Sequence, residues 1–476
     1  MFLKKYAEFV ILFFLLLLIA FFVLTSDTIS KINAPSNTVS MLTVDVSGSM
    51  DWPAFPSPVQ MAELPEELQA KLIQFRLDLQ NFSGSLTEQD KLHFFAGCDI
   101  CELTDFNDVD YDNLDLNRNH PLYETGKELN NRRSELTEET EDFEISKLTF
   151  AKQGLASLLS LQQLYQDFFD TNYLTGIILL SGYSSSMYFS SSESLDLEFA
   201  RHQVLNISSS SGTDISDGFK ETFKELEKIQ RREDVNIWIS ASKRIIFVSD
   251  GRSGTGLDSE AVLKKYGKMA DDNGIVIDVI GLGMLEDEVD SKLLSELAEL
   301  THGTYAFAST SNEIILAVMK AAHLGLGQTI VFESSNAILP LDSEKVLLEF
   351  KPTYETHVLL ASFNWSSGDF NMVLEDNAGN PIDPLLYTVE KKDNVILLNM
   401  TQPKIQSYKL RSVSVQPLEK PSEYIVLVSE NKGPLRIHDL FKDYWMFMVL
   451  GSVIILVSIH LIRTHLLKPK SKPTAV

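Results

Sequence analysis

The sequence predicts an α/β protein with a doubly wound, mainly parallel sheet, followed by a β-sandwich domain and flanked by two transmembrane helices. Three observations lead to this fold class. Apolar runs of strand length alternate with helical stretches over about 41–325, seven strand-like runs follow without helices between them, and a long uncharged apolar segment lies near each end of the chain. Alternating strands and helices favour a parallel sheet with helices on both faces, whereas consecutive short strands favour a sandwich.

The two apolar segments at the ends are residues 9–24, which follow Lys4 and Lys5, and residues 444–462, which precede a basic tail. A spanning helix needs roughly 20 apolar residues, so the second segment is predicted to cross the membrane and the first to be an uncleaved anchor or a signal segment. Because basic residues flank the outer end of each segment, both termini are predicted to be cytoplasmic and residues 27–443 extracytoplasmic.

The first folded domain takes its predicted strands from apolar runs that end in Gly, Ser or Asp, the pattern of strands buried on both faces. Its predicted helices begin with or soon after Ser, Asp or Asn, which cap helix N-termini. The expected strands lie within residues 41–50, 175–182, 244–251, 274–283 and 303–309, and the expected helices are 147–169, 216–232, 258–273, 290–300 and 312–322.

From Thr329 onward helical periodicity gives way to seven short strands separated by turn signals, which predicts a β-sandwich that serves as a stalk or packing domain. These strands lie within residues 331–341, 345–352, 357–365, 370–382, 394–400, 409–415 and 423–430. The expected organisation is an anchor or signal segment (1–26), a tether (27–40), the α/β domain (41–325) with an insertion (51–146), the β-sandwich domain (326–437), a transmembrane helix (444–462) and a basic cytoplasmic tail (463–476).

The charge of the chain excludes one class of partner. Its 66 acidic residues outnumber 41 basic residues, which gives a net charge of −25. A polyanion of this size repels phosphate backbones, so no nucleic-acid partner is expected.

Oxygen-bearing side chains gather where the predicted strands end. Asp45, Ser47 and Ser49 stand in D-x-S-x-S spacing after the first strand, Thr213 precedes a helix, and Asp250 ends a buried strand. The carboxyl ends of parallel strands share one edge of the sheet, where ligands bind. Hard cations such as Mg²⁺ prefer oxygen ligands, so these five residues are the predicted metal ligands. Taken singly, Thr213 is also a candidate helix cap and Asp250 a turn-forming residue.

These residues stand in segments that, in order, resemble those of a von Willebrand factor A (VWA) domain. The segments are DVSGSM, KLTFAKQGL, TGIILLSG, SSGTDISDGF, RIIFVSDG, GIVIDVIGLG and ELTHGTYAFAS, and they cover about 41–54 and 147–322. The resemblance implies a Rossmann-like fold and an intact metal-ion-dependent adhesion site (MIDAS) formed by all five candidate residues. It also implies that the cation, Mg²⁺ or else Mn²⁺ or Ca²⁺, keeps one position open for a carboxylate of a protein partner.

The insertion departs from the pattern of that family, in which a short loop is usual. It contains a predicted helix over residues 64–82 and an acidic tract, Asp99 to Glu144, with 15 acidic and 4 basic residues. Its position after the first metal loop predicts that it lies over or beside the metal face, where it gates the site or supplies specificity. The alternative is that residues 91–106 supply the second strand of the sheet.

Two weaker patterns fall in the same insertion. Asp108, Asp110, Asp112 and Asp115 mimic the start of an EF-hand loop, but Asn119 stands where that loop requires Glu, so a solvated acidic loop is predicted. Cys98 and Cys101 form a CxxC pair that follows a strand-like run, and a local structural disulfide is the preferred interpretation outside the cytoplasm.

The function expected from these observations is that of a membrane-anchored, non-enzymatic VWA protein that binds an acidic group of a protein partner through a divalent cation. Two alternatives stay open. One is a Bat-type membrane scaffold or assembly factor that works with an AAA+ ATPase, although an extracytoplasmic α/β domain is at odds with a cytoplasmic ATPase. The other is a thiol oxidoreductase that uses Cys98 and Cys101.

Overall fold

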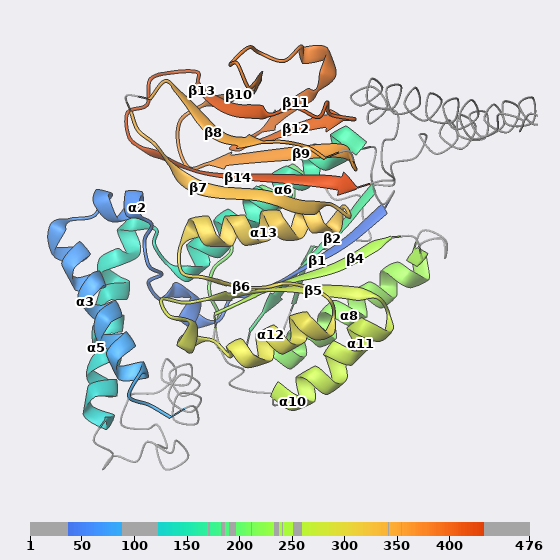
Figure 1. Ribbon diagram of the computed structural model, residues 1–476. Coiled ribbons are helices and arrows are strands. Elements are labelled where there is room, and N and C mark those ends of the chain that lie inside the picture. The colour runs from blue at the N-terminus through green and yellow to red at the C-terminus, as the bar shows by residue number, and fades with distance from the viewer. Residues whose placement is uncertain are drawn as a thin grey trace, which may run out of the picture.

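The structure is a computed structural model of the 476-residue chain, and its described part is layered (Figure 1). It describes residues 37–87, 122–169, 172–181, 186–189, 197–210, 212–232, 238–239, 241–250, 259–340, 342–353 and 355–432. The two predicted membrane segments, the CxxC pair and the Asp108–Asp115 stretch lie outside these residues. In the part of the chain that the structure describes, no helix combines the length and the apolar character needed to cross a bilayer.

The central sheet has six strands in the order β3-β2-β1-β4-β5-β6, which confirms the predicted doubly wound, mainly parallel arrangement. Its strands are β1 (Asn37–Asp45), β2 (Asn172–Leu180), β3 (Ser186–Phe189), β4 (Ser242–Ser249), β5 (Ile275–Leu282) and β6 (Tyr305–Ala308). All neighbours are parallel except β3, an antiparallel edge strand. Among the described strands, β2 and β4 pair with the two edges of β1, and residues 91–106, the alternative source of the second strand, lie outside the described residues.

Helices cover both faces of this sheet (Figure 1). On one side lie α6 (Lys147–Phe169), α7 (Leu197–Val204) and α13 (Ser311–Gly325), and on the other lie α8 (Ile215–Arg232), α10 (Ser259–Val262), the π-helical turn η3 (Leu263–Gly267), α11 (Lys268–Asp272) and α12 (Ser291–Leu300). The sequence of α8 explains why this helix packs on the sheet. Its buried residues recur at three- and four-residue spacing and form one apolar stripe: Ile215, Phe219, Phe223 and Leu226. The predicted helices are thus observed with small shifts at their ends.

The C-terminal strands form two antiparallel sheets that enclose a core of their own. A three-stranded sheet has the order β10-β13-β8 and a five-stranded sheet the order β11-β12-β9-β14-β7. The strands are β7 (Thr329–Ile338), β8 (Glu344–Phe350), β9 (Thr356–Trp365), β10 (Phe370–Asp376), β11 (Thr388–Lys392), β12 (Val395–Thr401), β13 (Tyr408–Ser414) and β14 (Ser422–Lys432). All seven predicted strands form, and β11 joins them as an edge strand whose charged sequence, TVEKK, gave no strand signal.

The five-stranded sheet is covered on both faces, because its other face packs on α6 and α13 (Figure 1). Alternate residues divide between two cores: Leu360, Leu397 and Leu427 join the core that contains α6 and α13, whereas their neighbours Ala361 and Leu398 join the core between the two antiparallel sheets. This period-two division follows from strand geometry. The sandwich is therefore a packed layer of the molecule and does not hang from it as a stalk.

The described part of the insertion contains α2 (Pro58–Glu63), α3 (Glu66–Ser83) and α5 (Tyr123–Thr140). Helices α3 and α5 lie side by side at the edge where β1 ends (Figure 1). Helix α3 matches the predicted helix over 64–82, whereas α5 was not predicted. Short 3₁₀ turns complete the inventory: η1 (Gly48–Asp51), η2 (Glu141–Phe143), η4 (Glu286–Glu288) and η5 (Pro384–Leu386).

Candidate metal centre

The first candidate loop is shaped by Asp45, the last residue of β1. Its Oδ1 accepts a hydrogen bond from the backbone N–H of Ser47 at 2.9 Å, which folds the loop back on the strand. Its Oδ2 accepts a hydrogen bond from the Ser249 hydroxyl at 2.7 Å, and Ser249 ends the neighbouring strand β4. Asp45 is fully buried. Both carboxylate oxygens are therefore fixed by groups from two adjacent strand ends.

The two serines of the loop point at the second carboxylate. The hydroxyl oxygens of Ser47 and Ser49 lie 3.0 Å apart, and the Ser49 hydroxyl donates to Asp250 Oδ1 at 3.1 Å. Ser47 Oγ is 3.5 Å from the same oxygen. All of these side chains are buried. The structure thus brings four of the five predicted ligands together in one hydrogen-bonded group.

The fifth predicted ligand, Thr213, lies in a segment that contacts the first loop. The backbone N–H of Ser210 donates to Val46 O at 2.5 Å, and the Ser209 hydroxyl donates to the Asp51 carboxylate. Thr213 is buried. The residue that caps α8 is the next one, Asp214, whose Oδ1 accepts a hydrogen bond from the backbone N–H of Asp217 at 3.0 Å. The alternative role of Thr213 as the helix cap is therefore taken by Asp214.

The charges at this site are unusual for a protein interior. Burial, together with the nearby charge of Asp250, raises the pKa of the Asp45 carboxyl to about 7, against the opposing effect of the hydrogen bonds from Ser47 and Ser249. Two carboxyl groups held together away from water favour protonation or a cation. Asp45 and Asp250 with the surrounding hydroxyls form an all-oxygen donor set, which suits a hard divalent cation such as Mg²⁺.

Two residues at the candidate site were missed from the sequence, Ser249, described above, and Lys147. Lys147, the first residue of α6, places its Nζ 2.9 Å from Asp250 Oδ2, and both side chains are almost completely buried. Burial lowers the pKa of Lys147, but the charges of Asp250 and Glu288 outweigh it and raise the pKa above its usual value. The position of Lys147 in the sequence was the one signal that could have identified it. The helix dipole disfavours a lysine in the first turn of a helix, so a lysine there indicates a compensating interaction with a negative group.

Lys147 links the candidate metal site to the insertion. Its ammonium lies 5.1 Å from the centre of the Trp52 ring, and the Arg133 guanidinium of α5 lies 4.2 Å from the same ring. Arg133 also forms a buried ion pair with Glu288 at 2.9 Å. Burial would raise the pKa of Glu288, but Lys147 and Arg133 hold it below its usual range. We call Asp45, Asp250, Lys147, Arg133 and Glu288 the charge cluster.

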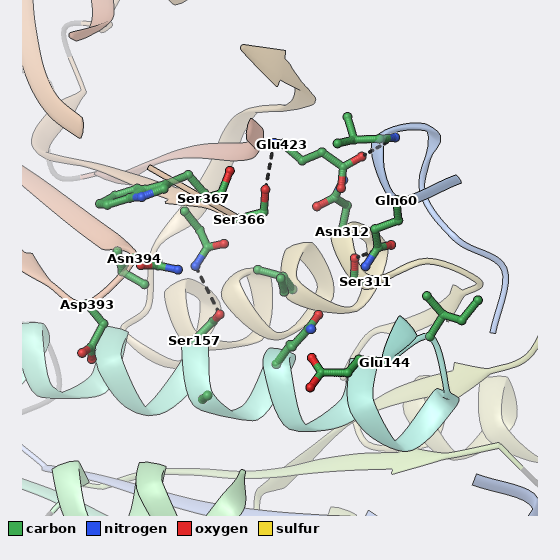
Figure 2. Close-up of a pocket in the computed structure, with 18 of the residues that line it drawn as sticks. Gln60, Glu144, Ser157, Ser311, Asn312, Ser366, Ser367, Asp393, Asn394 and Glu423 are labelled. Atoms are coloured by element: carbon green, nitrogen blue, oxygen red, sulfur yellow. Dashed lines mark hydrogen bonds between the residues drawn. The ribbon is translucent and has the colours of Figure 1, made fainter. Parts of the chain in front are cut away.

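A separate cavity of about 420 Å³ lies between α2, α6, α13 and the sandwich. Figure 2 shows that polar side chains from these elements point into it, among them Ser157 on α6, whose hydroxyl accepts from Asn364 Nδ2 at 3.2 Å. None of the five predicted ligands lines this cavity. Among the described residues there is also no group of three or more His, Cys, Asp or Glu side chains placed to hold a metal. The hydroxyl-rich site at Asp45 and Asp250 is of a different kind.

Comparisons with known proteins give a distant likeness. No protein-family model matches the sequence, and no curated protein matches it. Among solved structures, a von Willebrand factor type A protein from Catenulispora acidiphila is 13% identical with a TM-score of 0.32, and covers 62% of this chain and 56% of its own. The open conformation of the pilus adhesin SpaC from Lactobacillus rhamnosus GG is 12% identical with a TM-score of 0.32, covering 60% and 41%.

A third structure, the proximal thread matrix protein 1 from the mussel byssus with a zinc-occupied MIDAS motif, is 11% identical with a TM-score of 0.25, covering 38% of this chain and 44% of its own. This chain therefore spans little more than half, or less, of the length of the three structures. At these identities and TM-scores the likeness does not define a family for the chain.

Proposed function

We propose that this chain is a membrane-anchored, VWA-type binding protein that holds a divalent cation, Mg²⁺ by preference, with Asp45, Ser47, Ser49, Thr213 and Asp250, and presents it to an acidic group of a protein partner. The observation that carries the proposal is the hydrogen-bonded group at the end of β1 and β4, in which two buried carboxylates and two hydroxyls converge.

The chemistry of this donor set supports a binding role. Five side-chain ligands leave one of the six positions that Mg²⁺ prefers open, so the cation keeps affinity for another oxygen ligand. A carboxylate of a partner protein is the anion that supplies a hard oxygen ligand together with a negative charge. The site lies at the carboxyl edge of the parallel sheet, where ligands of doubly wound folds bind.

Metal binding is the first test. The purified full-length chain is titrated with Mn²⁺, followed by electron paramagnetic resonance of free Mn²⁺, next to Asp45→Ala and Asp250→Asn. We expect one Mn²⁺ equivalent to be lost in both variants, because each removes a carboxylate from the site. Ser160→Ala, on the sandwich side of α6, is the matched control and should bind as the unmodified chain does. Unchanged Mn²⁺ affinity in Asp45→Ala would exclude the metal site.

Partner binding is the second test. The full-length chain, immobilised in detergent, is used to capture proteins with Mg²⁺ and with EDTA, and the capture is repeated with Asp45→Ala. We expect a partner that is retained only with Mg²⁺ and only by the unmodified site. A partner that is retained equally in EDTA would show that the cation is not the binding group.

A further inference from the structure

The metal face contains a cation of its own. The Lys147 ammonium is 2.9 Å from Asp250 Oδ2, on the opposite carboxylate oxygen from the one that Ser49 contacts. The side chains of Lys147 and Asp250 are 2% and 0% exposed, so water does not screen the pair. One oxygen of Asp250 therefore contacts the hydroxyls of the candidate metal loop, and the other contacts the Lys147 ammonium.

Lys147 is held in this position by its surroundings. It begins α6, its backbone N–H donates to Trp52 O at 3.1 Å, and its ammonium lies 5.1 Å from the Trp52 ring centre. Arg133 covers the same ring from the insertion at 4.2 Å. Because the Lys147 side chain is 2% exposed and its ammonium contacts Asp250, a cation bound by Asp250 must share that carboxylate with Lys147.

A count of charges shows the consequence. When its carboxylates are ionised, the charge cluster holds three negative and two positive groups, for a net charge of −1. A bound divalent cation changes this to +1. Without Lys147 the two values would be −2 and 0. Lys147 therefore makes the cluster a weaker site for the metal and, once the metal is bound, a site with an excess positive charge.

We propose that Lys147 sets the ligand preference of the metal face: it lowers the affinity for the divalent cation and gives the metal-loaded site a net positive charge that selects an anionic ligand from the partner. This inference rests on the proposed function, since it concerns the same site. It assigns Lys147 a positioning and specificity role, because its ammonium acts through Asp250 and the local potential.

The proposal makes two predictions of opposite sign for Lys147→Met. The variant should bind Mn²⁺ about tenfold more tightly, because a positive charge close to the metal is removed. At the same time the Mn²⁺-loaded variant should bind acetate several-fold more weakly. Acetate is the probe for a carboxylate ligand, and its binding is read from the broadening of its methyl proton resonance by protein-bound Mn²⁺. A side chain with only a packing role would not move these two affinities in opposite directions.

Three further variants of the full-length chain complete the experiment. Lys320→Met removes the same charge from α13, where Lys320 pairs with Glu333 of the sandwich, and should change neither affinity. Lys147→Arg keeps the charge and should keep the acetate binding. Lys147→Gln is measured beside Lys147→Met, so that the comparison does not depend on one neutral replacement, and thermal melting checks that both are folded. Mn²⁺ bound by Asp45→Ala measures the background from the acidic tract.

The outcomes separate this inference from the proposed function. If the unmodified chain binds no more Mn²⁺ than Asp45→Ala, the metal site itself is absent and the proposed function fails. If the unmodified chain binds Mn²⁺ but both neutral variants bind it with equal or lower affinity, or bind acetate as well as before, the role of Lys147 is wrong while the metal site stands.

Discussion

At the scale of single residues, the candidate site depends on groups that orient the carboxylates as much as on the carboxylates themselves. Asp45 would rotate about its side-chain bonds without the Ser47 N–H and the Ser249 hydroxyl, which fix one oxygen each. Partners that orient metal ligands commonly contribute 10- to 100-fold to metal affinity. Ser249, which no ligand pattern marks, is therefore part of the site.

Ser249→Ala tests this role. We expect Mn²⁺ affinity to fall by about tenfold, because Asp45 loses the donor that fixes Oδ2 while all five proposed ligands remain. The measurement is the same Mn²⁺ titration, with Ser160→Ala as a serine-to-alanine control remote from the site. Equal affinities for Ser249→Ala and the unmodified chain would show that Asp45 is oriented by Ser47 alone.

The proximity of Asp45 and Asp250 could be predicted from the sequence, because both residues follow strands and the strand ends of a parallel sheet share an edge. Lys147 and Ser249 could not be predicted in the same way. Lys147 reaches the site across an insertion of about a hundred residues, and Ser249 contacts Asp45 only through the lateral pairing of β1 and β4. Contacts of this kind follow from packing and leave no periodic signal.

At the scale of elements, the insertion contains a helix that the sequence did not predict, α5, whose Arg133 pairs with Glu288 of η4. The composition of α5 is polar. Its two leucines, Leu129 and Leu136, are buried, and Arg133 is the buried residue among its charged side chains. Two buried leucines in 18 residues give a weak helical pattern. The ion pairs with α3, Lys71–Glu139 and Arg132–Asp78, are about one-third to two-fifths exposed and add little to stability, because water screens them.

Neighbouring arginines of α5 allow a matched comparison. Arg133→Met should lower the free energy of unfolding by about 3–5 kcal/mol, because it leaves the buried Glu288 carboxylate without its partner. Arg132→Met, which removes an ion pair that is about one-third exposed, should cost less than about 1 kcal/mol. Chemical denaturation measures both values, and limited proteolysis of α5 shows whether the insertion loosens first. Equal losses in the two variants would contradict the anchoring role of Arg133.

At the scale of the whole molecule, the sandwich and the α/β unit share one hydrophobic core, in which Leu360, Leu397 and Leu427 of the sandwich lie with residues of α6 and α13. Two features of the sequence are consistent with this: the strands at 357–365 and 423–430 are apolar along both faces. Apolar residues on both faces of these strands indicate that both faces are buried. Which helices cover them cannot be predicted from the sequence, since that depends on the arrangement of the layers.

Separating the two units should therefore expose a large apolar face. We expect a fragment of residues 37–325 to have a lower melting temperature than a fragment of residues 37–432 and to associate in solution, because α6 and α13 would present their sandwich-facing side chains to water. Size-exclusion chromatography and thermal melting give the comparison. A monomeric 37–325 fragment with an unchanged melting temperature would show that the shared core contributes no stability.

The same interface contains a pH-sensitive group. His323 of α13 is fully buried, and its Nδ1 and Nε2 lie 2.6 and 2.8 Å from the hydroxyls of Ser429 and Ser362 on β14 and β9. Burial lowers its pKa to about 3. In the unfolded chain the pKa of a histidine is about 6.5. Between these values the unfolded chain binds a proton that the folded chain does not, so stability is complete above pH 6.5 and falls as the pH falls towards 3.

The difference between the two pKa values of His323 corresponds to a contribution of as much as about 5 kcal/mol to the free energy of unfolding above pH 6.5. His323→Gln should remove this contribution, so the difference in unfolding free energy between the unmodified chain and the variant should be largest above pH 6.5 and should shrink as the pH falls. Exposed His202, replaced by Gln, controls for the loss of a histidine elsewhere. The measurement is urea denaturation at several pH values from 7.5 to 4. A difference that stays constant over this range would mean that His323 titrates alike in the folded and unfolded chains, and that the interface between the two units does not sense pH through it.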